Sequence, residues 1–372
     1  MVACLQAVAD AEARGDARGA LELINEHPDG ADGDFFWKLS RLQRLMQLVV
    51  LGDLVPRWAV SRWILAQSLT VLDDRLRAGH AEALRVATEL RGGPGALPGL
   101  DLADGQVKVM DTDWVYRQLS LYEHGGLALF LAHHASVDLV AGAERVGEWT
   151  DASMRSLRLV EREPTRLFYE DLASGAVLTV PNSGASVLTL PGEHVLGRIV
   201  PVDAGEMFDG LPLLVGRGVA EECAGAPDAW VDALRRDARR SVGERISFGM
   251  AGHNQVLTDV PELVWQLPML SFAGRAVGRS VTPEVVVDAA FEAVRAAMDG
   301  SLERRLAADH EGDDVDPWSS LAAALVHPLV LGRAWDELGG SEPEALLALA
   351  DRLFGPAGDL CRAIAAEDAD AA

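Results

Sequence analysis

Cysteine is scarce in this sequence, which holds three in 372 residues, at Cys4, Cys223 and Cys361. The three lie far apart, their number is odd, and no Cys-x-x-Cys pair occurs. A disulfide framework needs paired cysteines at regular spacings. The pattern therefore excludes such a framework and predicts a protein of the reducing cytoplasm.

Long apolar runs are also missing. The longest, such as 45–51, falls far short of the roughly 20 residues that cross a bilayer. Residues 1–16 carry acidic side chains early and lack a basic segment followed by an apolar one. The sequence predicts neither a membrane-spanning helix nor a signal peptide.

Positive charge is in deficit: 33 lysines and arginines stand against 57 aspartates and glutamates, giving a net charge of −24 and a pI near 4.7. Such a surface repels the phosphates of nucleic acids and the headgroups of anionic lipids. We expect no nucleic-acid partner and no membrane partner. The simplest interpretation is a general acidity that favours solubility.

The common linear motifs of catalysis do not occur. The sequence lacks Gly-x-Ser-x-Gly, the Walker phosphate loop and His-Glu-x-x-His. The run 216–218 supplies two glycines of the dinucleotide fingerprint but not the third. The sequence thus identifies no catalytic residue and no cofactor. It leaves open whether the protein is an enzyme.

The composition is that of a globular protein, with 49% hydrophobic and 24% charged residues. The length allows two or three domains. The patterning predicts a mostly helical α+β fold. Its expected parts are a helical domain or hairpin array over 1–152, a small antiparallel barrel-like β module over 153–216, and a second helical domain over 217–372.

Two helical patterns stand out near the N-terminus. Residues 11–24 form two amphipathic segments separated by Gly15 and Asp16, which resembles a single tetratricopeptide-like hairpin, although no fixed-period repeat follows. Residues 35–51 place Leu39, Leu45 and Met46 on one helix face with Phe36, Leu42 and Val49, and the basic residues 38, 41 and 44 on the other. We expect Arg44 to face solvent.

Further helices are expected over 113–137, 228–240, 282–298, 317–327 and 342–354. The last should begin with a capping box of Ser341 and Glu344. Between the helical parts, short apolar runs alternate with glycine- or proline-containing turns. These runs predict strands at 157–160, 166–169, 177–180, 187–190, 195–200 and 211–215.

The phrases Tyr169-Glu-Asp-Leu172, Ser174-Gly175, Leu190-Pro-Gly-Glu193 and Leu196-Gly-Arg-Ile-Val-Pro201 follow one another here. This order resembles the β module of some bacterial proteins that carry a SEC-C motif, over residues 156–215. Ser174 replaces the threonine and Glu193 the aspartate of that pattern. The cysteine-rich SEC-C motif itself is absent, so the resemblance implies a framework of turns and no metal or catalytic residue.

Arginines supply the main candidates for binding. Arg198 lies in a predicted strand, where it either pairs with Glu170, Asp171 or Glu193 or binds an acidic ligand. The densest positive cluster is on the helix over 228–240, where it either binds a phosphate or acidic partner or forms a solvated face. Its members are Arg235, Arg236, Arg239 and Arg240.

Two loops complete the candidates. His253 and Asn254 lie in a glycine-flanked polar turn that fits a ligand contact as well as a plain loop. The acidic run 309–316 offers possible cation ligands, although it lacks the glycine and glutamate of a calcium loop at its sixth and twelfth positions. An exposed loop ending in a helix cap is the alternative. The potential metal ligands are Asp309, His310, Glu311, Asp313 and Asp314.

Two hypotheses of function follow. The first is a cytoplasmic, non-catalytic interaction or scaffold protein with a protein partner, since the nine tryptophans include several that could anchor an interface, and self-association stays open. The second is an enzyme without a linear motif, such as a metal-dependent hydrolase that uses the carboxylates of 309–316.

Overall fold

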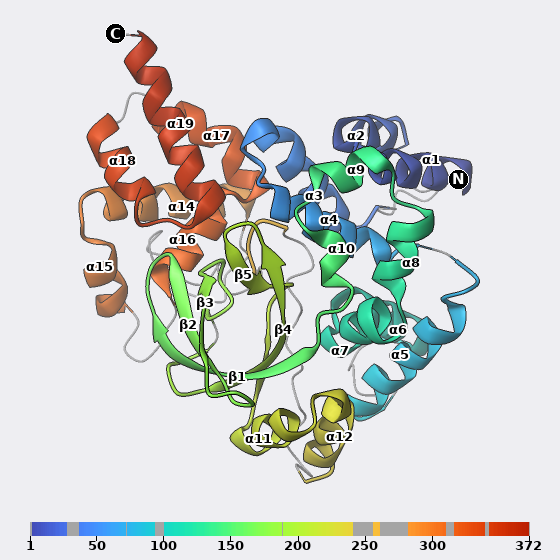
Figure 1. The fold of residues 1–372 in the computed structure, drawn as a ribbon. Coiled ribbons are helices and arrows are strands. Elements are labelled where there is room, and N and C mark those ends of the chain that lie inside the picture. The colour runs from blue at the N-terminus through green and yellow to red at the C-terminus, as the bar shows by residue number, and fades with distance from the viewer. Residues whose placement is uncertain are drawn as a thin grey trace.

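The computed structural model describes residues 2–27, 37–71, 73–93, 100–187, 189–240, 256–260, 282–309, 316–338 and 342–371. A small antiparallel β module lies between two groups of helices, with the helices α11 and α12 beside it (Figure 1). The expected mostly helical α+β fold class is confirmed. No helix in these ranges is long and apolar enough to cross a membrane.

The N-terminal group begins with the helical hairpin that residues 11–24 predict. Asp16 separates α1 from α2, and its carboxylate accepts a hydrogen bond from the backbone N–H of Gly19 at 2.8 Å. The elements are α1 (Val2–Ala13), α2 (Ala17–Glu26), α3 (Leu39–Leu51), η1 (Gly52–Leu54), α4 (Arg57–Ser68), α5 (Arg77–Leu90), α6 (Leu102–Thr112), α7 (Trp114–Gln118), η2 (Leu119–Glu123), α8 (Gly126–His133), α9 (Val137–Gly142) and α10 (Val146–Trp149).

The prediction of one continuous helix over 113–137 is wrong. The helix α7 passes into η2, a turn of π-helix, and ends before Gly125, which adopts a left-handed φ of +70°. A Cβ on Gly126 would lie 2.5 Å from the carbonyl oxygen of Ser120. The two adjacent glycines therefore allow the sharp turn into α8.

The β module contains β1 (Met154–Arg162), β2 (Arg166–Asp171), β3 (Val177–Pro181), β4 (His194–Val202), β5 (Gly205–Phe208) and β6 (Leu213–Val215). The prediction of a strand at 187–190 is wrong. There the backbone N–H groups of Val187 and Thr189 donate to the carbonyls of Gly184 and Ser186, so local turns replace a ladder. The sequence patterning also missed β5.

The sheet is antiparallel throughout, with the strand order β3-β2-β1-β4-β5, and β6 also pairs with β4. The first half of β4 lies between β1 and β6, and its second half pairs with β5. Because β5 also comes close to β3, the sheet is nearly a closed barrel. Its interior includes the rings of Tyr169 and Phe208, which meet edge to face with centroids 5.2 Å apart.

The C-terminal elements are α11 (Arg217–Gly225), η3 (Pro227–Ala229), α12 (Trp230–Arg240), α14 (Pro283–Met298), α15 (Leu302–Asp309), α16 (Pro317–Leu325), α17 (Pro328–Leu338), α18 (Pro343–Ala350) and α19 (Gly355–Ala371). Asp316 caps α16 by accepting the backbone N–H of Trp318. The predicted capping box at α18 includes Ser341, which lies outside the described residues.

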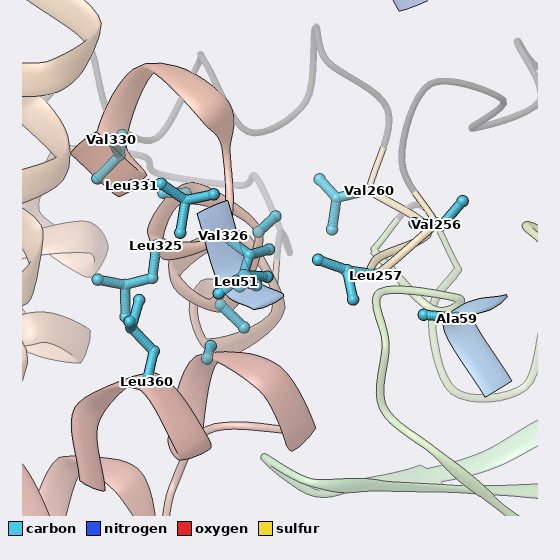
Figure 2. Packing of buried hydrophobic residues seen from close by; sticks show 14 of the residues in the cluster. Leu51, Ala59, Val256, Leu257, Val260, Leu325, Val326, Val330, Leu331 and Leu360 are labelled. Carbon is cyan, nitrogen blue, oxygen red and sulfur yellow. The ribbon is translucent and has the colours of Figure 1, made fainter. Parts of the chain in front are cut away.

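The first and last helical groups share a hydrophobic core. Gln47 of α3 donates its side-chain N–H to the carbonyl of Val326 at 2.9 Å. The short segment 256–260 is buried between the two groups, and Figure 2 shows Leu257 directed toward the side chains around Val326. A second core joins α5 and α7 to α11, α12 and the β module. The domain boundaries proposed from the sequence stay a prediction.

Candidate ligand-binding site

A cavity of about 560 Å³ lies where these two hydrophobic cores meet. Helices α1, α3, α4, α5, α6 and α7 contribute to its wall, together with the turn after β5 and the segment 256–260. Leu69 lines the cavity and packs against both cores. Junctions between packed units are common places for ligand sites.

Three buried arginines line this cavity: Arg44 of α3, Arg62 of α4 and Arg117 of α7. Their exposed fractions are only 7%, 4% and 8%. We call these three residues the arginine floor. Two buried aspartates, Asp209 and Asp259, line the cavity beside them. A third buried carboxylate, Glu12, acts electrostatically on Arg44.

Arg62 is held by Asp259 and by the β module. Its Nη1 lies 3.0 Å from one carboxylate oxygen of Asp259, and its Nη2 donates to the other at 3.2 Å. The same Nη2 donates to the carbonyl of Phe208 at 2.8 Å, and the guanidinium stacks on the ring of Trp58. The Nε of Arg62 has no hydrogen-bond partner among the described residues.

Arg117 is held by the turn that follows β5. It donates to the carbonyl of Asp209 at 3.3 Å, and its Nη2 lies 3.9 Å from the Asp209 carboxylate. That carboxylate also accepts hydrogen bonds from Gln118 and Tyr122. A Cβ on Gly210 would lie 3.0 Å from Nη1 of Arg117, so a larger residue there would press on the guanidinium.

Burial dominates the electrostatics of Arg44. The pKa of its guanidinium is lowered to about 10, mainly by loss of solvent; the charge of Glu12 opposes this shift, and the positive charges of Arg41 and Arg117 add to it. Arg44 still carries its proton at neutral pH. A nearby anion would favour the charged form of the guanidinium.

The charges around the exposed part of the cavity are already paired. Lys38 contacts Asp111, Arg77 contacts Asp74, and Arg75 binds Asp73 at 2.7 Å. The hydrogen bonds from Arg75 hold the pKa of Asp73 well below its usual range. His80 contacts the hydroxyl of Tyr116 at 3.0 Å, and burial lowers the pKa of its imidazole.

The sequence placed Arg44 on a solvent-facing side of its helix, and this prediction is wrong. Leu39 and Met46, which were expected in the core, are instead 57% and 40% exposed. The helix α3 is rotated so that one flank meets the C-terminal helices and another lines the cavity. Periodicity gives the spacing of a face, but the partners of the helix decide which face is buried.

Arg198 is buried, and none of its expected local partners binds it. It donates to Gln118 at 2.8 Å and to Glu123 at 2.6 Å, and its guanidinium stacks on Tyr122. Side chains two positions apart share a strand face, so Arg198 lies on the same side of β4 as the buried Leu196. Its contacts with Gln118 connect β4 to the residues around Asp209.

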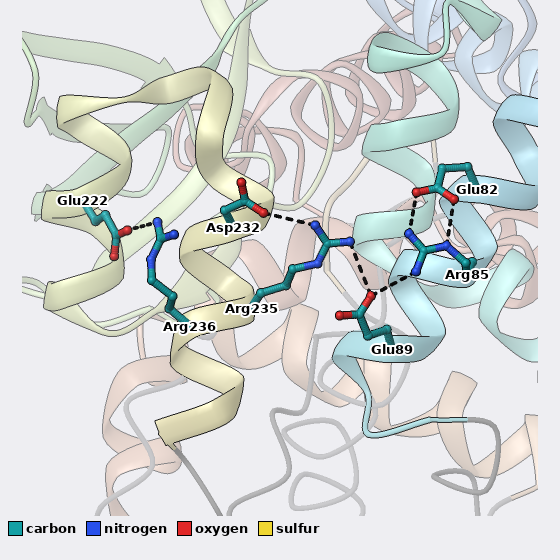
Figure 3. Close-up of polar contacts among 7 residues, drawn as sticks. All are labelled: Glu82, Arg85, Glu89, Glu222, Asp232, Arg235 and Arg236. Carbon is teal, nitrogen blue, oxygen red and sulfur yellow. Dashed lines mark hydrogen bonds and ion pairs between the residues drawn. The ribbon is translucent and has the colours of Figure 1, made fainter.

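The arginine cluster of α12 is spread over ion pairs with neighbouring helices (Figure 3). Arg235 binds Asp232 and Glu89, and Arg236 binds Glu222. None of these residues lines the cavity. The side chains of Arg239 and Arg240 are outside the part of the chain that the structure describes.

The remaining candidates fall outside the described residues. These are His253, Asn254, His310, Glu311, Asp313 and Asp314, together with the side chain of Asp309 at the end of α15. Within the described ranges, no group of three or more histidines, cysteines, aspartates or glutamates is placed to hold a metal ion.

The arginine floor has no linear signature, because its members come from helices separated by many residues. One local signal was available. Arg62 interrupts the apolar run Trp58-Ala-Val-Ser-Arg-Trp-Ile-Leu65, where a charged side chain is unusual unless it is paired or binds something.

No protein-family model, curated protein or solved structure matches this chain. The likeness of the β module to that of SEC-C proteins, and of α1 and α2 to a tetratricopeptide hairpin, therefore stay predictions. The candidate site stands on its own geometry.

Proposed function

We propose that this protein binds a small anionic molecule, with a phosphate group as the preferred anion, in the cavity above the arginine floor. One observation carries the proposal: Arg44, Arg62 and Arg117 converge, buried, on one cavity of ligand size. Burying an arginine is costly unless its charge is compensated. Asp259 and Asp209 contact two of the three arginines, and a bound anion would bring further negative charge to the same place.

The acidity of the whole chain strengthens the argument. A net charge of −24 repels anions from most of the surface. A cavity lined by three buried arginines is therefore a selective place for an anion rather than part of a generally basic surface. Guanidinium groups also match phosphate oxygens with forked, charge-assisted hydrogen bonds.

The two aspartates have a positioning role in this proposal. Asp259 fixes Arg62 from one side, and Asp209 lies against Arg117 while Gln118 and Tyr122 hold its carboxylate. Fixing the guanidinium groups before the ligand arrives reduces the entropy lost on binding. The arginine floor and its two aspartates would bind the ligand. Chemical turnover of the ligand would be an additional property.

The test is calorimetric titration of the full chain with inorganic phosphate at constant ionic strength. We expect saturable binding, because the anion gains charge-assisted hydrogen bonds at the floor. Arg44→Gln should weaken the affinity by roughly 10- to 100-fold, the equivalent of about 1.5–3 kcal/mol for hydrogen bonds to a charged group. Arg44→Lys keeps the charge, so its affinity for phosphate should lie between those of the wild type and Arg44→Gln.

Arg236→Gln is the matched control, since Arg236 is a surface arginine of α12 paired with Glu222. It should leave phosphate binding unchanged. The proposal fails if phosphate does not bind the wild-type protein, or if Arg236→Gln weakens binding as much as Arg44→Gln does.

The interaction hypothesis and the hydrolase hypothesis both stay predictions from the sequence. The first would gain from a protein partner that binds in competition with phosphate. The second rests on the loop 309–316, whose residues 310–315 lie outside the described ranges.

A further inference from the structure

We infer that the ligand is a monoester of phosphate with a compact apolar body, whose phosphate binds the arginine floor and whose body packs on the apolar wall of the cavity. This inference rests on the proposed function and specifies its ligand class. Three features of the cavity support it: its size, its apolar wall and the charges at its exposed part.

The size is too large for a bare phosphate ion. Cavities of roughly 300–1,000 Å³ accommodate drug-sized organic molecules, and this one measures about 560 Å³. If the arginine floor holds only the anionic group, most of the volume remains for the rest of the ligand.

The wall beside the floor is largely apolar and not fully covered. Leu5, Ala66, Leu69, Val71, Met110 and Val256 line the cavity. Leu69, Val71 and Met110 are each half-buried, packing against a core on one side while lining the cavity with the rest of the side chain. Covering such surface stabilises a complex in proportion to the apolar area removed from water.

The charges at the exposed part limit the ligand to one anionic end. Asp73, Asp74 and Asp111 lie there, each paired with a basic residue. Asp73 stays ionised because the side chain of Arg75 holds its carboxylate in three hydrogen bonds. A second phosphate at the far end of the ligand would have to compete with these carboxylates for their basic partners, whereas a neutral body leaves the ion pairs intact.

The experiment is calorimetric titration of the wild-type chain with inorganic phosphate and then with methyl, ethyl, propyl and butyl phosphate. Each methylene that reaches the wall should tighten binding about fourfold, the equivalent of roughly 0.8 kcal/mol per buried CH₂. Butylammonium, which has the same chain and the opposite charge, should not bind.

Two wall variants sharpen the test. Val71→Thr and Met110→Gln keep the approximate shape of the side chain and make it polar. We expect them to reduce the gain from phosphate to butyl phosphate by at least half and to leave the affinity for inorganic phosphate unchanged. Their unchanged phosphate affinity would also show that the variants fold.

The outcomes separate this inference from the proposed function. If phosphate binds but the alkyl series gains no affinity, or gains it equally in Val71→Thr and Met110→Gln, the apolar body is refuted and anion binding stands. If neither phosphate nor any ester binds, both are refuted.

Discussion

The arginines of α12 and those of the cavity are the same kind of residue in opposite environments. Arg235 and Arg236 lie near the surface, and each has a carboxylate within its own helix or a neighbouring one (Figure 3). Arg44, Arg62 and Arg117 are buried, come from separate helices and line one cavity. A cluster that is conspicuous in sequence can thus be neutral in the fold, while scattered residues can assemble a site.

The largest expected contrast between the two groups is in stability. Asp259→Ala leaves buried Arg62 without its carboxylate, and we expect it to lower the free energy of unfolding by about 3–5 kcal/mol. Glu222→Ala removes the surface partner of Arg236 and should cost less than about 1 kcal/mol. Urea denaturation of both variants measures the difference. Equal losses would mean that burial does not distinguish the two groups.

A buried histidine should make the stability of the fold depend on pH, whereas an exposed one should not. Burial lowers the pKa of His327 to about 4, and its Nδ1 accepts a backbone N–H from Leu329, which suits the neutral ring. Between about pH 6.5 and 4 the unfolded chain binds a proton that the folded chain excludes, so stability falls as pH falls through this window. The expected loss is about 3 kcal/mol.

Urea denaturation at pH 7 and pH 4.5 checks this expectation. His327→Gln should flatten the pH dependence, since the replacement does not titrate. The exposed His133 provides the control, and His133→Gln should retain the wild-type slope. A slope that survives in His327→Gln would assign the acid sensitivity to other groups.

A smaller effect concerns the geometry of the floor. Gly210→Ala places a methyl group against the guanidinium of Arg117, and we expect about tenfold weaker phosphate binding, or about 1.4 kcal/mol. Gly216→Ala is the control, because a Cβ there meets nothing within 4 Å and its φ of −66° suits any residue. Calorimetric titration of both variants with phosphate measures the two affinities. Equal affinities would mean that Arg117 takes no part in binding phosphate.

The smallest effect is expected on α12. Arg236→Gln should change the free energy of unfolding by less than about 0.5 kcal/mol, and added salt should reduce the difference further, because exposed ion pairs are weak and screened. Urea denaturation at low and high salt measures it. A loss above 2 kcal/mol would show that this helix depends on its arginines after all.

Much of the fold followed from local pattern. The helical hairpin around Asp16, the cap at Asp316 and most strands of the β module depend on neighbours in sequence, and these predictions are confirmed. The errors arose where contacts distant in sequence decide the outcome. Residues 187–190 resemble a strand but satisfy their backbone in turns, and the helix over 113–137 is interrupted at Gly125.

The candidate site could not be predicted in the same way. Arg44 sits in an amphipathic pattern that assigns it to solvent, and only the packing of α3 against the rest of the fold places it in the cavity. Arg198 lacked its expected strand partners because Glu123, Gln118 and Tyr122 reach it from η2 and α7. Buried polar contacts between distant segments leave little trace in a single sequence.

The position of a bound tetrahedral oxyanion is the strictest test of anion binding at the arginine floor. Crystals of the wild-type protein grown with tungstate would reveal the tungsten by its anomalous scattering. We expect a tungsten peak in the cavity, within hydrogen-bonding reach of Arg44, Arg62 and Arg117. A peak on α12 beside Arg235 and Arg236, with an empty cavity, would contradict it.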